Sequence, residues 1–516
     1  MNNRRLAVLM AFHAMWGLVL WLSISKYGLG ISTDSVHLLF GGLNLAEGRG
    51  LISFDGSFLA LWPPLYSMLL ALIHLVSGLD VFASANVLQA ASFLGLSVCL
   101  SVLFLKIFPD NFLLALAANI LSNAGAVVLA AFDIVGSDYV HLFFAMLLIL
   151  LAGYYIESKS ARILLAMSVV GTLAMFQRYL GIAAIATGAA VVFFFTDESL
   201  LRRIGRSLLM ALSALPAGIW LFFTLPLTSR RAPISFADNF SWFSKSVLEW
   251  FLPVEAVKAN LPVYTAWLWI VITGLILLVI FSPSRYRQFS FFAAPIAIYG
   301  MFYLLALFGT ASITYFNKLG GRFLLPLYIP FVTLLILASG ILLRFANERK
   351  SKPLSRVVSV VVIGGLVVIA GSLLRITIPL AIASRATGAA GENAFNTKEW
   401  RENSVMNYWL EHQPQGEYVL FSNYPDAIAF YTWHGSSPSP RKFSGPYGKE
   451  EFPVTQYASE LFASGLDVYI IWIEPNAYSF FYPVEELGAI ANIKPVFISK
   501  DGGIYNLKPV MNFWGW

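Results

Sequence analysis

The sequence predicts an α-helical polytopic membrane protein with a small α/β domain at its C-terminal end. Hydrophobic residues make up 58% of the 516 residues and charged residues only 12%, whereas soluble domains carry about 25% charged residues. Long apolar runs recur along the chain, and several reach the ~17 to 25 residues that a helix needs to cross a bilayer. After about residue 384 the chain becomes polar and rich in turn residues. These three observations separate a membrane domain, residues 1–383, from a soluble domain, residues 384–516.

The first apolar run follows Arg4 and Arg5. It exceeds the ~7 to 15 residues typical of a signal peptide and has no small-x-small cleavage site. We therefore expect an uncleaved first helix. Because basic residues remain on the cytoplasmic side, the N-terminus should be cytoplasmic.

Hydropathy predicts about eleven crossings. If each crossing reverses the side, the loops rich in Lys and Arg, such as "DESLLRRIGR" and "RFANERKSKPLSR", all fall in the cytoplasm. The C-terminal domain then lies on the extracytoplasmic face of the cell membrane. The expected spans are 6–26, 83–107, 112–131, 138–156, 162–178, 180–196, 207–227, 263–282, 290–308, 322–343 and 357–380.

The first external loop, about residues 27–82, contains two short apolar segments. Residues 63–78 begin with Pro-Pro and are too short for a comfortable crossing. A crossing there would also place the basic loops outside. Residues 35–48 carry one apolar helical face. We expect both segments to form helices at the outer interface.

The soluble domain alternates helical and strand patterns. A helix is expected near residues 399–412, followed by a strand "YVLFSN", a helix "DAIAFYTW" and a strand "DVYIIWI". A hairpin, "PVFISKDGGIYNLKP", should turn at "DGG". This order predicts a small α/β unit.

Composition and motifs disfavour several classes of function. The one cysteine, Cys99, excludes an internal disulfide and a cysteine-based metal site. No GxGxxG or Walker pattern is present, which argues against a nucleotide-driven machine. The net charge of +6 resides largely in short loops and sets orientation, so nucleic acid binding is not implied.

Ionisable groups gather at the outer ends of the expected spans. Such groups are costly in a membrane, about 2.5 to 3.5 kcal/mol at mid-span, so each needs an explanation. They pair to satisfy one another, or they line a polar cavity in which a carboxylate accepts a proton beside a bound phosphate. The charged residues concerned are Asp34, Asp133, Asp138, Arg178, Lys318 and Arg322, and Tyr179 follows Arg178.

Other polar and aromatic residues leave two interpretations open. His37 and His141 each lie three residues after an aspartate, so they either ligate a metal or form hydrogen bonds at the interface. A divalent metal is possible but not indicated, and no cofactor is expected. Trp62 and Tyr66 either stack on a bound ligand or anchor the chain at the interface. Asp426 has no accompanying nucleophile pattern and is interpreted as structural, as is His434.

The order of these features resembles the GT-C glycosyltransferases. More narrowly, it is similar to the bacterial branch related to dolichyl-phosphate-mannose protein mannosyltransferases and to lipid A aminoarabinose transferase. The resemblance covers roughly residues 1–345. The segments that carry it are an acidic residue after the first span, "WPPLYSMLLALIHLVSG" at 62–78, "SDYVHLFFAMLLI" at 137–149, "QRYLGI" at 177–182 and "GGRFLLPLYIPF" at 320–331.

The resemblance implies inverting transfer of a sugar from a polyprenyl-phosphate donor, bound from the membrane, on the non-cytoplasmic face. The acceptor is a hydroxyl of a lipid, glycan or protein. By position, Asp34 is implied as the catalytic base, Asp138 stands where relatives often have an acidic residue, and Arg178 and Arg322 match the "RY" and "R-x-x-x-P" positions.

The chain departs from the family pattern in two places. Many relatives have a second acidic residue directly after the first, whereas Ser35 follows Asp34 here. His37 or Phe40 stands in place of the usual aromatic residue. Both departures bear on the acceptor and on any need for a metal.

The candidate site combines Asp34 as general base with a set of substrate-binding residues. The main alternative is a transporter or flippase for an anionic or lipid-linked solute, which should show charges at mid-membrane and inverted repeats. A polymer ligase or noncatalytic assembly protein is a third reading. The candidate substrate-binding residues are His37, Trp62, Tyr66, Asp138, His141, Arg178, Tyr179, Lys318 and Arg322.

Overall fold

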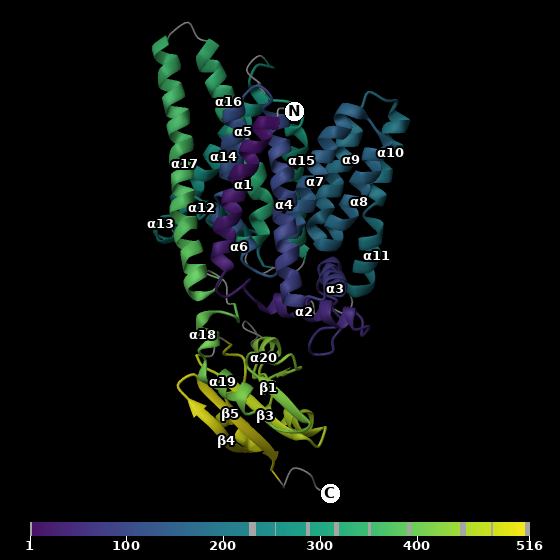
Figure 1. Cartoon of the computed structure of the whole chain (residues 1–516), viewed down its shortest axis with the longest axis vertical. Helices are drawn as coiled ribbons and strands as arrows, with labels where there is room; N and C mark the ends of the chain where they lie inside the picture. Colours follow the sequence, from purple (N-terminus) through teal and green to yellow (C-terminus); the bar gives the residue numbers. More distant parts are fainter. Residues whose placement is uncertain are drawn as a thin grey trace. The chain divides into compact units, whose positions relative to one another are not determined.

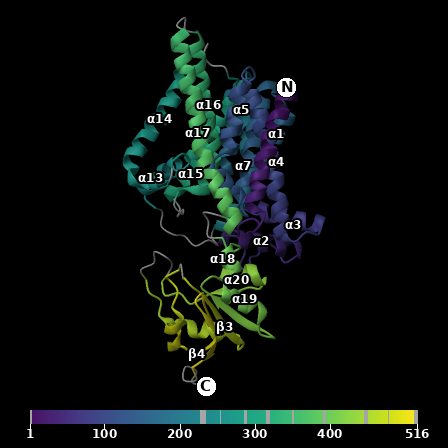
Figure 2. The same cartoon turned by 60° about the vertical axis from the view of Figure 1, so that its left-hand side comes forward.

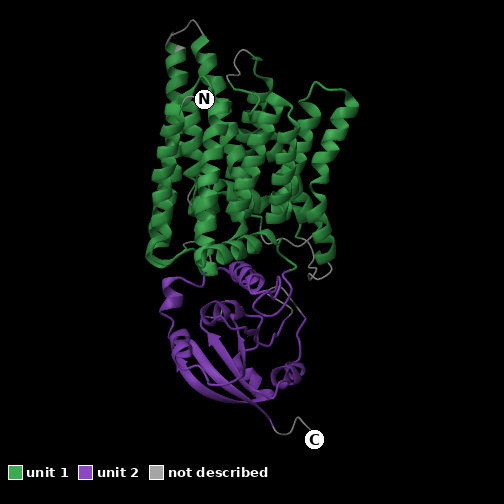
Figure 3. Ribbon diagram, turned by 45° about the vertical axis from the view of Figure 1, so that its right-hand side comes forward, with its two compact units in different colours: residues 1–29, 60–391 green, residues 30–59, 392–516 purple. Residues whose placement is uncertain are grey.

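In the computed structural model the described chain divides into two compact units. One unit contains residues 1–29 and 60–391, and the other contains residues 30–59 and 392–516; Figure 3 colours them green and purple. The second unit thus takes part of the loop between the first two predicted spans as well as the C-terminal region. The structure describes all residues except 1–2, 226–233, 253, 285–288, 314–318, 349–351, 390–393, 444–449, 476–477 and 511–516.

The first unit is a helical bundle, which confirms the predicted polytopic membrane fold. Among the described residues, seven helices are long and apolar enough to cross a membrane, and two bent pairs raise the number to nine. The seven are α1 (Asn3–Ile24), α4 (Val81–Ile107), α7 (Ser137–Ser158), α14 (Leu261–Phe281), α15 (Ala293–Ile313), η4 with α16 (Gly321–Leu324 and Leu325–Glu348) and α17 (Lys352–Thr387).

The bent pairs and two shorter helices occupy the remaining predicted spans. The helix α5 (Phe112–Asn123) meets α6 (Ala126–Phe132) at 55°, and α10 (Leu200–Leu212) meets α11 (Leu215–Thr224) at 41°. The helix α8 (Ala161–Gln177) has 17 residues, and η1 (Tyr179–Gly181) leads into α9 (Ile182–Phe194) with 13. The eleven predicted ranges therefore each contain helix, but the count of eleven crossings is not established.

The bundle is organised around α7. This helix packs against α4, α8 and α9, and its buried side chains include Tyr139 and Tyr155. By contrast, α14 buries only Leu268. Figures 1 and 2 show α17 running alongside α16, with valines such as Val360 exposed. Exposed apolar surface on such long helices suits contact with lipid tails.

Shorter helices complete this unit. The helix α3 (Leu65–Ser77) buries Tyr66 and exposes Leu75 and Val76. Its 13 residues span only about 20 Å, which is short of the hydrocarbon core and fits the predicted interfacial helix. Two further short helices are α12 (Phe236–Leu248) and α13 (Val254–Ala259).

The second unit contains a five-stranded sheet with the strand order β2-β1-β3-β5-β4. The first three strands in this order are parallel, and β5 is antiparallel to both β3 and β4. The strands are β1 (Tyr418–Ser422), β2 (Ser437–Pro438), β3 (Asp467–Ile473), β4 (Ala491–Ser499) and β5 (Gly502–Pro509). The predicted hairpin is thus present, and its turn holds Gly502 at a φ of 124°.

Apolar clusters cover both faces of the sheet. Trp409 and Ile428 pack with Ile471 on one face, whereas Leu461 and Leu487 belong to the cluster on the other. The alternation along β3 sends successive side chains to opposite faces. The predicted α/β domain is confirmed. Its helices are α18 (Lys398–Arg401), α19 (Ser404–Glu411), α20 (Pro425–Thr432), η5 (Val454–Tyr457), α21 (Ala458–Phe462) and η6 (Val484–Ala489).

Residues 30–59 belong to the fold of this second unit. The helix α2 (Thr33–Ala46) begins at a capping box formed by Ser32 and Ser35 and packs against α20. The backbone N–H of Ile31 donates to Asn396 Oδ1 at 3.0 Å, and the rings of Phe40 and Trp433 lie 5.3 Å apart. A helix predicted at 35–48 is therefore present, and its contacts are with the C-terminal region.

Candidate functional site

Three charged residues from distant parts of the chain meet in the first unit. Asp138 lies in the first turn of α7, Arg178 caps the end of α8, and Arg322 lies in η4. Arg178 Nη1 forms an ion pair with Asp138 Oδ1, and Arg322 Nη1 lies 4.0 Å from Asp138 Oδ2. We call Asp138, Arg178, Arg322 and Phe323 the Asp138 cluster.

An aromatic ring completes this cluster. The guanidinium carbons of Arg178 and Arg322 lie 5.3 Å and 5.8 Å from the centroid of Phe323. Cations over a ring face gain about 0.5 to 2 kcal/mol, depending on desolvation. Tyr303 Oη donates to the Phe323 carbonyl at 2.9 Å, which anchors the segment that carries the ring.

The position of Arg178 follows from the sequence "QRYLGI". The helix α8 ends at Gln177 because Arg178 is extended, with φ −151° and ψ 136°. The loop then folds back on the last turn of α8, since the Gly181 N–H donates to the Arg178 carbonyl at 2.7 Å. A Cβ at Gly181 would collide with the backbone of Ala174, so only glycine permits this return.

A pair of glycines, Gly320 and Gly321, positions Arg322. Gly321 has a φ of +53°, in the left-handed region that favours glycine. A Cβ at Gly320 would collide with Ser246 Oγ of α12. The "GG" before Arg322 is therefore needed for the turn into η4 and for its close approach to α12.

The charges of this cluster do not cancel. Two guanidinium groups face one carboxylate, so the cluster keeps one unit of positive charge. The side chains of Arg178, Arg322 and Asp138 are 15%, 33% and 9% exposed. Such partly buried, forked donors bind the oxygens of phosphate well.

A second group of titratable residues lies in the second unit. His37 Nδ1 lies 2.5 Å from Ser53 Oγ, and His37 Nε2 lies 3.4 Å from Asp426 Oδ1. Asp34 and Asp55 act electrostatically on both His37 and Asp426. We call Asp34, His37, Ser53, Asp55 and Asp426 the Asp426 cluster.

The pKa values of Asp426 and His37 are both shifted in the direction that favours the neutral side chain. The pKa of Asp426 is raised to about 7, mainly by burial, with a contribution from the charges of Asp55 and Asp34; hydrogen bonds from its own backbone and from Thr33 oppose the rise. Burial lowers the pKa of His37, against the opposing effect of Asp55 and Asp34. The charged forms of both groups are disfavoured because burial removes their hydration.

Sequence reasoning interpreted Asp426 as structural, although a signal was present. Asp426 follows β1 and lies in the first turn of α20. The strand β1 lies between β2 and β3 in the sheet. The connection after β1 runs to β2 on one side, and the next connection crosses to β3 on the other side of β1. Ligand sites of open α/β sheets lie beyond the carboxyl ends of strands at such switch points.

The other predicted site residues have the following surroundings. His141 is fully buried, and its Nδ1 lies 3.2 Å from the carbonyl of Ala174, so it supports the end of α8 that carries Arg178. Tyr179 faces Trp220 and Thr224. Tyr66 is fully buried and Trp62 is half-buried. Lys318 lies outside the described residues.

Asp133 has partners of its own. Ser23 Oγ of α1 donates to Asp133 Oδ1 at 2.6 Å, and Ser384 of α17 also hydrogen-bonds to it. Asp133 is 2% exposed. It therefore links helices α1, α6 and α17 rather than joining the Asp138 cluster.

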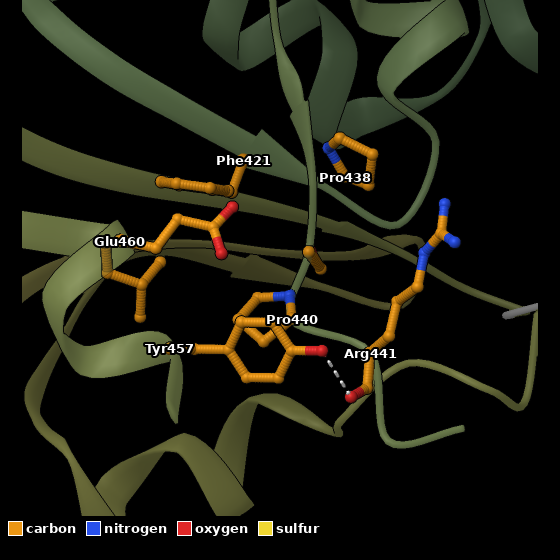
Figure 4. Close-up of a pocket in the computed structure, with 8 residues that line it drawn as sticks. Phe421, Pro438, Pro440, Arg441, Tyr457 and Glu460 are labelled. Carbon is orange, nitrogen blue, oxygen red and sulfur yellow. Dashed lines mark hydrogen bonds between the residues drawn. The ribbon is translucent and has the colours of Figure 1, made fainter. Parts of the chain in front are cut away.

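Two further features of the described residues bear on ligands. They contain no group of three or more His, Cys, Asp or Glu side chains placed to hold a metal ion. A pocket of about 210 Å³ in the second unit holds none of the predicted site residues, and Tyr457 Oη there donates to the Arg441 carbonyl at 3.0 Å (Figure 4). Its lining residues are Phe421, Pro438, Ser439, Pro440, Arg441, Tyr457, Glu460 and Leu461.

Comparison with known proteins gives a result at the level of fold. No family model and no curated protein sequence matches the chain. The crystal structure of ArnT from Cupriavidus metallidurans bound to undecaprenyl phosphate matches 97% of this chain and 98% of its own, with a TM-score of 0.61 and 12% identity. The apo structure of the same ArnT matches over the same shares with a TM-score of 0.58 and 11% identity. The chain therefore has the fold of ArnT, in agreement with the resemblance stated from the sequence.

Proposed function

We propose that this protein is a GT-C-type glycosyltransferase that transfers a sugar from a polyprenyl-phosphate donor to a hydroxyl acceptor, with inversion, on the extracytoplasmic face of the membrane. The fold supports this proposal, because the similar ArnT structure is one bound to undecaprenyl phosphate. The acceptor belongs to one of three classes: lipid, glycan or protein.

The Asp138 cluster is the observation that carries the proposal. Arg178 and Arg322 leave one positive charge after Asp138 is counted. The leaving polyprenyl phosphate gains negative charge as its bond to the sugar breaks, and preorganised cations stabilise that charge most strongly where water is scarce. Phe323 holds both guanidinium groups in place. Phosphate binding is therefore the role we assign to the two arginines.

Asp34 is the proposed general base. It lies in the first turn of α2, where the helix N-terminus favours a carboxylate. In the reaction, the acceptor oxygen attacks the anomeric carbon while Asp34 takes the hydroxyl proton. The bond between the sugar and the phosphate oxygen breaks, and the phosphate leaves with the bonding electrons. A single displacement of this kind inverts the anomeric carbon.

The experiment measures transfer of a radiolabelled sugar from polyprenyl-phosphate donors to membrane acceptors, with wild type and Asp34→Asn at equal expression. We expect transfer by the wild type and its loss in Asp34→Asn, with donor binding retained. Asp467→Asn is the matched control, because Asp467 is an exposed aspartate of the same unit. Equal transfer by wild type and Asp34→Asn would remove Asp34 as base.

The same membrane preparation also distinguishes a glycosyltransferase from a transporter or flippase. Vesicles that accumulate an anionic solute or lipid-linked sugar, with no transfer from any donor, would contradict the glycosyltransferase proposal. An assembly protein would show neither transfer nor uptake.

A further inference from the structure

Asp426 is a buried carboxyl group that the proposed chemistry has not used. Its side chain is 17% exposed and faces His37 and Asp34 of α2, Asp55 of the following loop, and Tyr478. Thr33 donates a hydrogen bond to it. The candidate base and Asp426 thus belong to one cluster within the second unit.

The sheet places Asp426 where an α/β fold presents functional groups. The ends of β1 and β3 are joined by Asn423, whose Nδ2 donates to the Ile473 carbonyl at 2.8 Å and whose Oδ1 accepts from the Ile473 N–H at 2.9 Å. Directly after this clamp, α20 begins and carries Asp426 in its first turn. The carboxyl group is therefore held rigidly beyond the strand ends, at the switch point.

The charges of Asp34 and Asp55 disfavour ionisation of Asp426. Asp426 and His37 together can gain or lose one proton. With the proton on Asp426, its O–H faces His37 Nε2, which lies 3.4 Å away, and the His37 Nδ1–H donates to Ser53 Oγ. With the proton lost, the neutral imidazole carries its hydrogen on Nε2, facing the Asp426 carboxylate, and the Ser53 hydroxyl donates to Nδ1. Ser53 serves both states because a hydroxyl donates and accepts.

We propose that Asp426 is a positioning residue for the candidate base: it shares one proton with His37, and loss of that proton makes Asp34 a stronger proton acceptor. The proton goes to water, so the cluster gains one negative charge. A like charge nearby raises the proton affinity of a carboxylate, and a stronger base speeds proton removal from the acceptor. This inference rests on the proposed function for its catalytic consequence only.

The first test measures the shared proton without any transfer reaction. Infrared spectra of the full-length protein are recorded from about pH 5 to about pH 9, and the carbonyl stretch of protonated carboxyl groups is followed. We expect the wild-type spectra to contain a component of this band that disappears as the pH rises through neutrality and that is absent from the spectra of Asp426→Asn. Asp467→Asn should keep the band. An unchanged band in Asp426→Asn would overturn the proposal.

The second test measures the pH dependence of transfer. We expect the wild-type rate to rise about three-fold between about pH 6 and about pH 8, as expected for a moderate gain in base strength. Asp426→Asn should stay at the low-pH rate throughout, Asp426→Glu should restore the rise, and Asp467→Asn should match the wild type. A rise retained in Asp426→Asn, with normal folding by thermal unfolding, would overturn the positioning role.

The two tests separate this inference from the proposed function. If the wild type transfers no sugar at any pH, the proposed function fails and the catalytic part of the inference fails with it. The infrared titration still decides whether Asp426 holds a proton that it loses near neutral pH. If transfer occurs but no neutral-range band is found, the proposed function stands and the inference is overturned.

Discussion

The two charged clusters treat a partly buried aspartate in opposite ways. In the Asp138 cluster, the carboxylate faces two guanidinium groups, which stay charged at any physiological pH. In the Asp426 cluster, the carboxyl group faces a histidine and two further aspartates. The difference teaches that one cluster is built for fixed charge and suits an anion, whereas the other is built to gain and lose a proton.

The largest effect is expected for Asp34→Asn, which should lower the rate of transfer without lowering donor binding. Asp34→Asn should lower the rate of sugar transfer by about 10² to 10⁴-fold, the usual worth of a general base. Donor binding should remain, because we assign the phosphate to the other cluster. Single-turnover transfer and binding of a labelled polyprenyl-phosphate donor measure the two quantities. A parallel loss of both would remove the distinction between the clusters.

Arg178→Gln should affect binding and stability together. Loss of the guanidinium group removes the nearest partner of Asp138. Breaking a buried ion pair lowers the free energy of unfolding by about 3 to 5 kcal/mol. The double variant Arg178→Gln with Asp138→Asn should recover most of the free energy of unfolding but should not recover donor binding. Thermal unfolding and donor binding test this. Recovery of binding in the double variant would show that the arginine only balances Asp138.

Asp426→Asn should change how stability depends on pH. The folded state raises the pKa of Asp426 from 3.8 to about 7, so folding favours the neutral form. The resulting penalty is absent below about pH 4, grows as the pH rises, and is complete above about pH 7. Asn avoids the penalty, so the variant should gain about 4 kcal/mol over wild type at pH 8 and less than about 1 kcal/mol at pH 4.

The measurement is unfolding of wild type, Asp426→Asn and Asp467→Asn at both pH values. Asp467→Asn should follow the wild type. A gain in Asp426→Asn that is equal at low and high pH would mean that Asp426 carries a fixed charge like Asp138.

Arg322→Gln should have a milder effect than Arg178→Gln. Its side chain is one-third exposed and lies 4.0 Å from Asp138, and exposed pairs contribute about 0 to 1 kcal/mol. We expect donor affinity to fall about tenfold, the worth of one charge-assisted hydrogen bond, with nearly unchanged stability. Arg344→Gln, which removes a surface pair with Glu348, is the control. A loss of stability in Arg322→Gln alone would make its role structural.

Chelation of divalent metal should have the smallest effect. Because the two arginines supply the positive charge, we expect transfer to continue after treatment with EDTA. Loss of transfer that Mg²⁺ or Zn²⁺ restores would show that a metal is needed and that the Asp138 cluster does not by itself provide the charge for phosphate.

Local sequence predicted much of the fold and singled out residues in both clusters. The apolar runs determine the helices, because lipid leaves backbone groups no other partner. Asp138, Arg178 and Arg322 stood out because each lies at the end of an apolar run, where a charge is costly without a partner. The structure adds that the glycines of "QRYLGI" and "GGRF" form the turns that position the two arginines.

Tertiary structure decided which segments pair. Asp426 looked structural because its partner, His37, belongs to the first loop, far away in the sequence. Likewise, the bend between α5 and α6 and the joining of residues 30–59 to the C-terminal region have no periodic signal. Hydropathy and helical spacing report the environment of each segment alone. Contacts between distant segments, and the burial that raises the pKa of Asp426, exist only once the chain has folded.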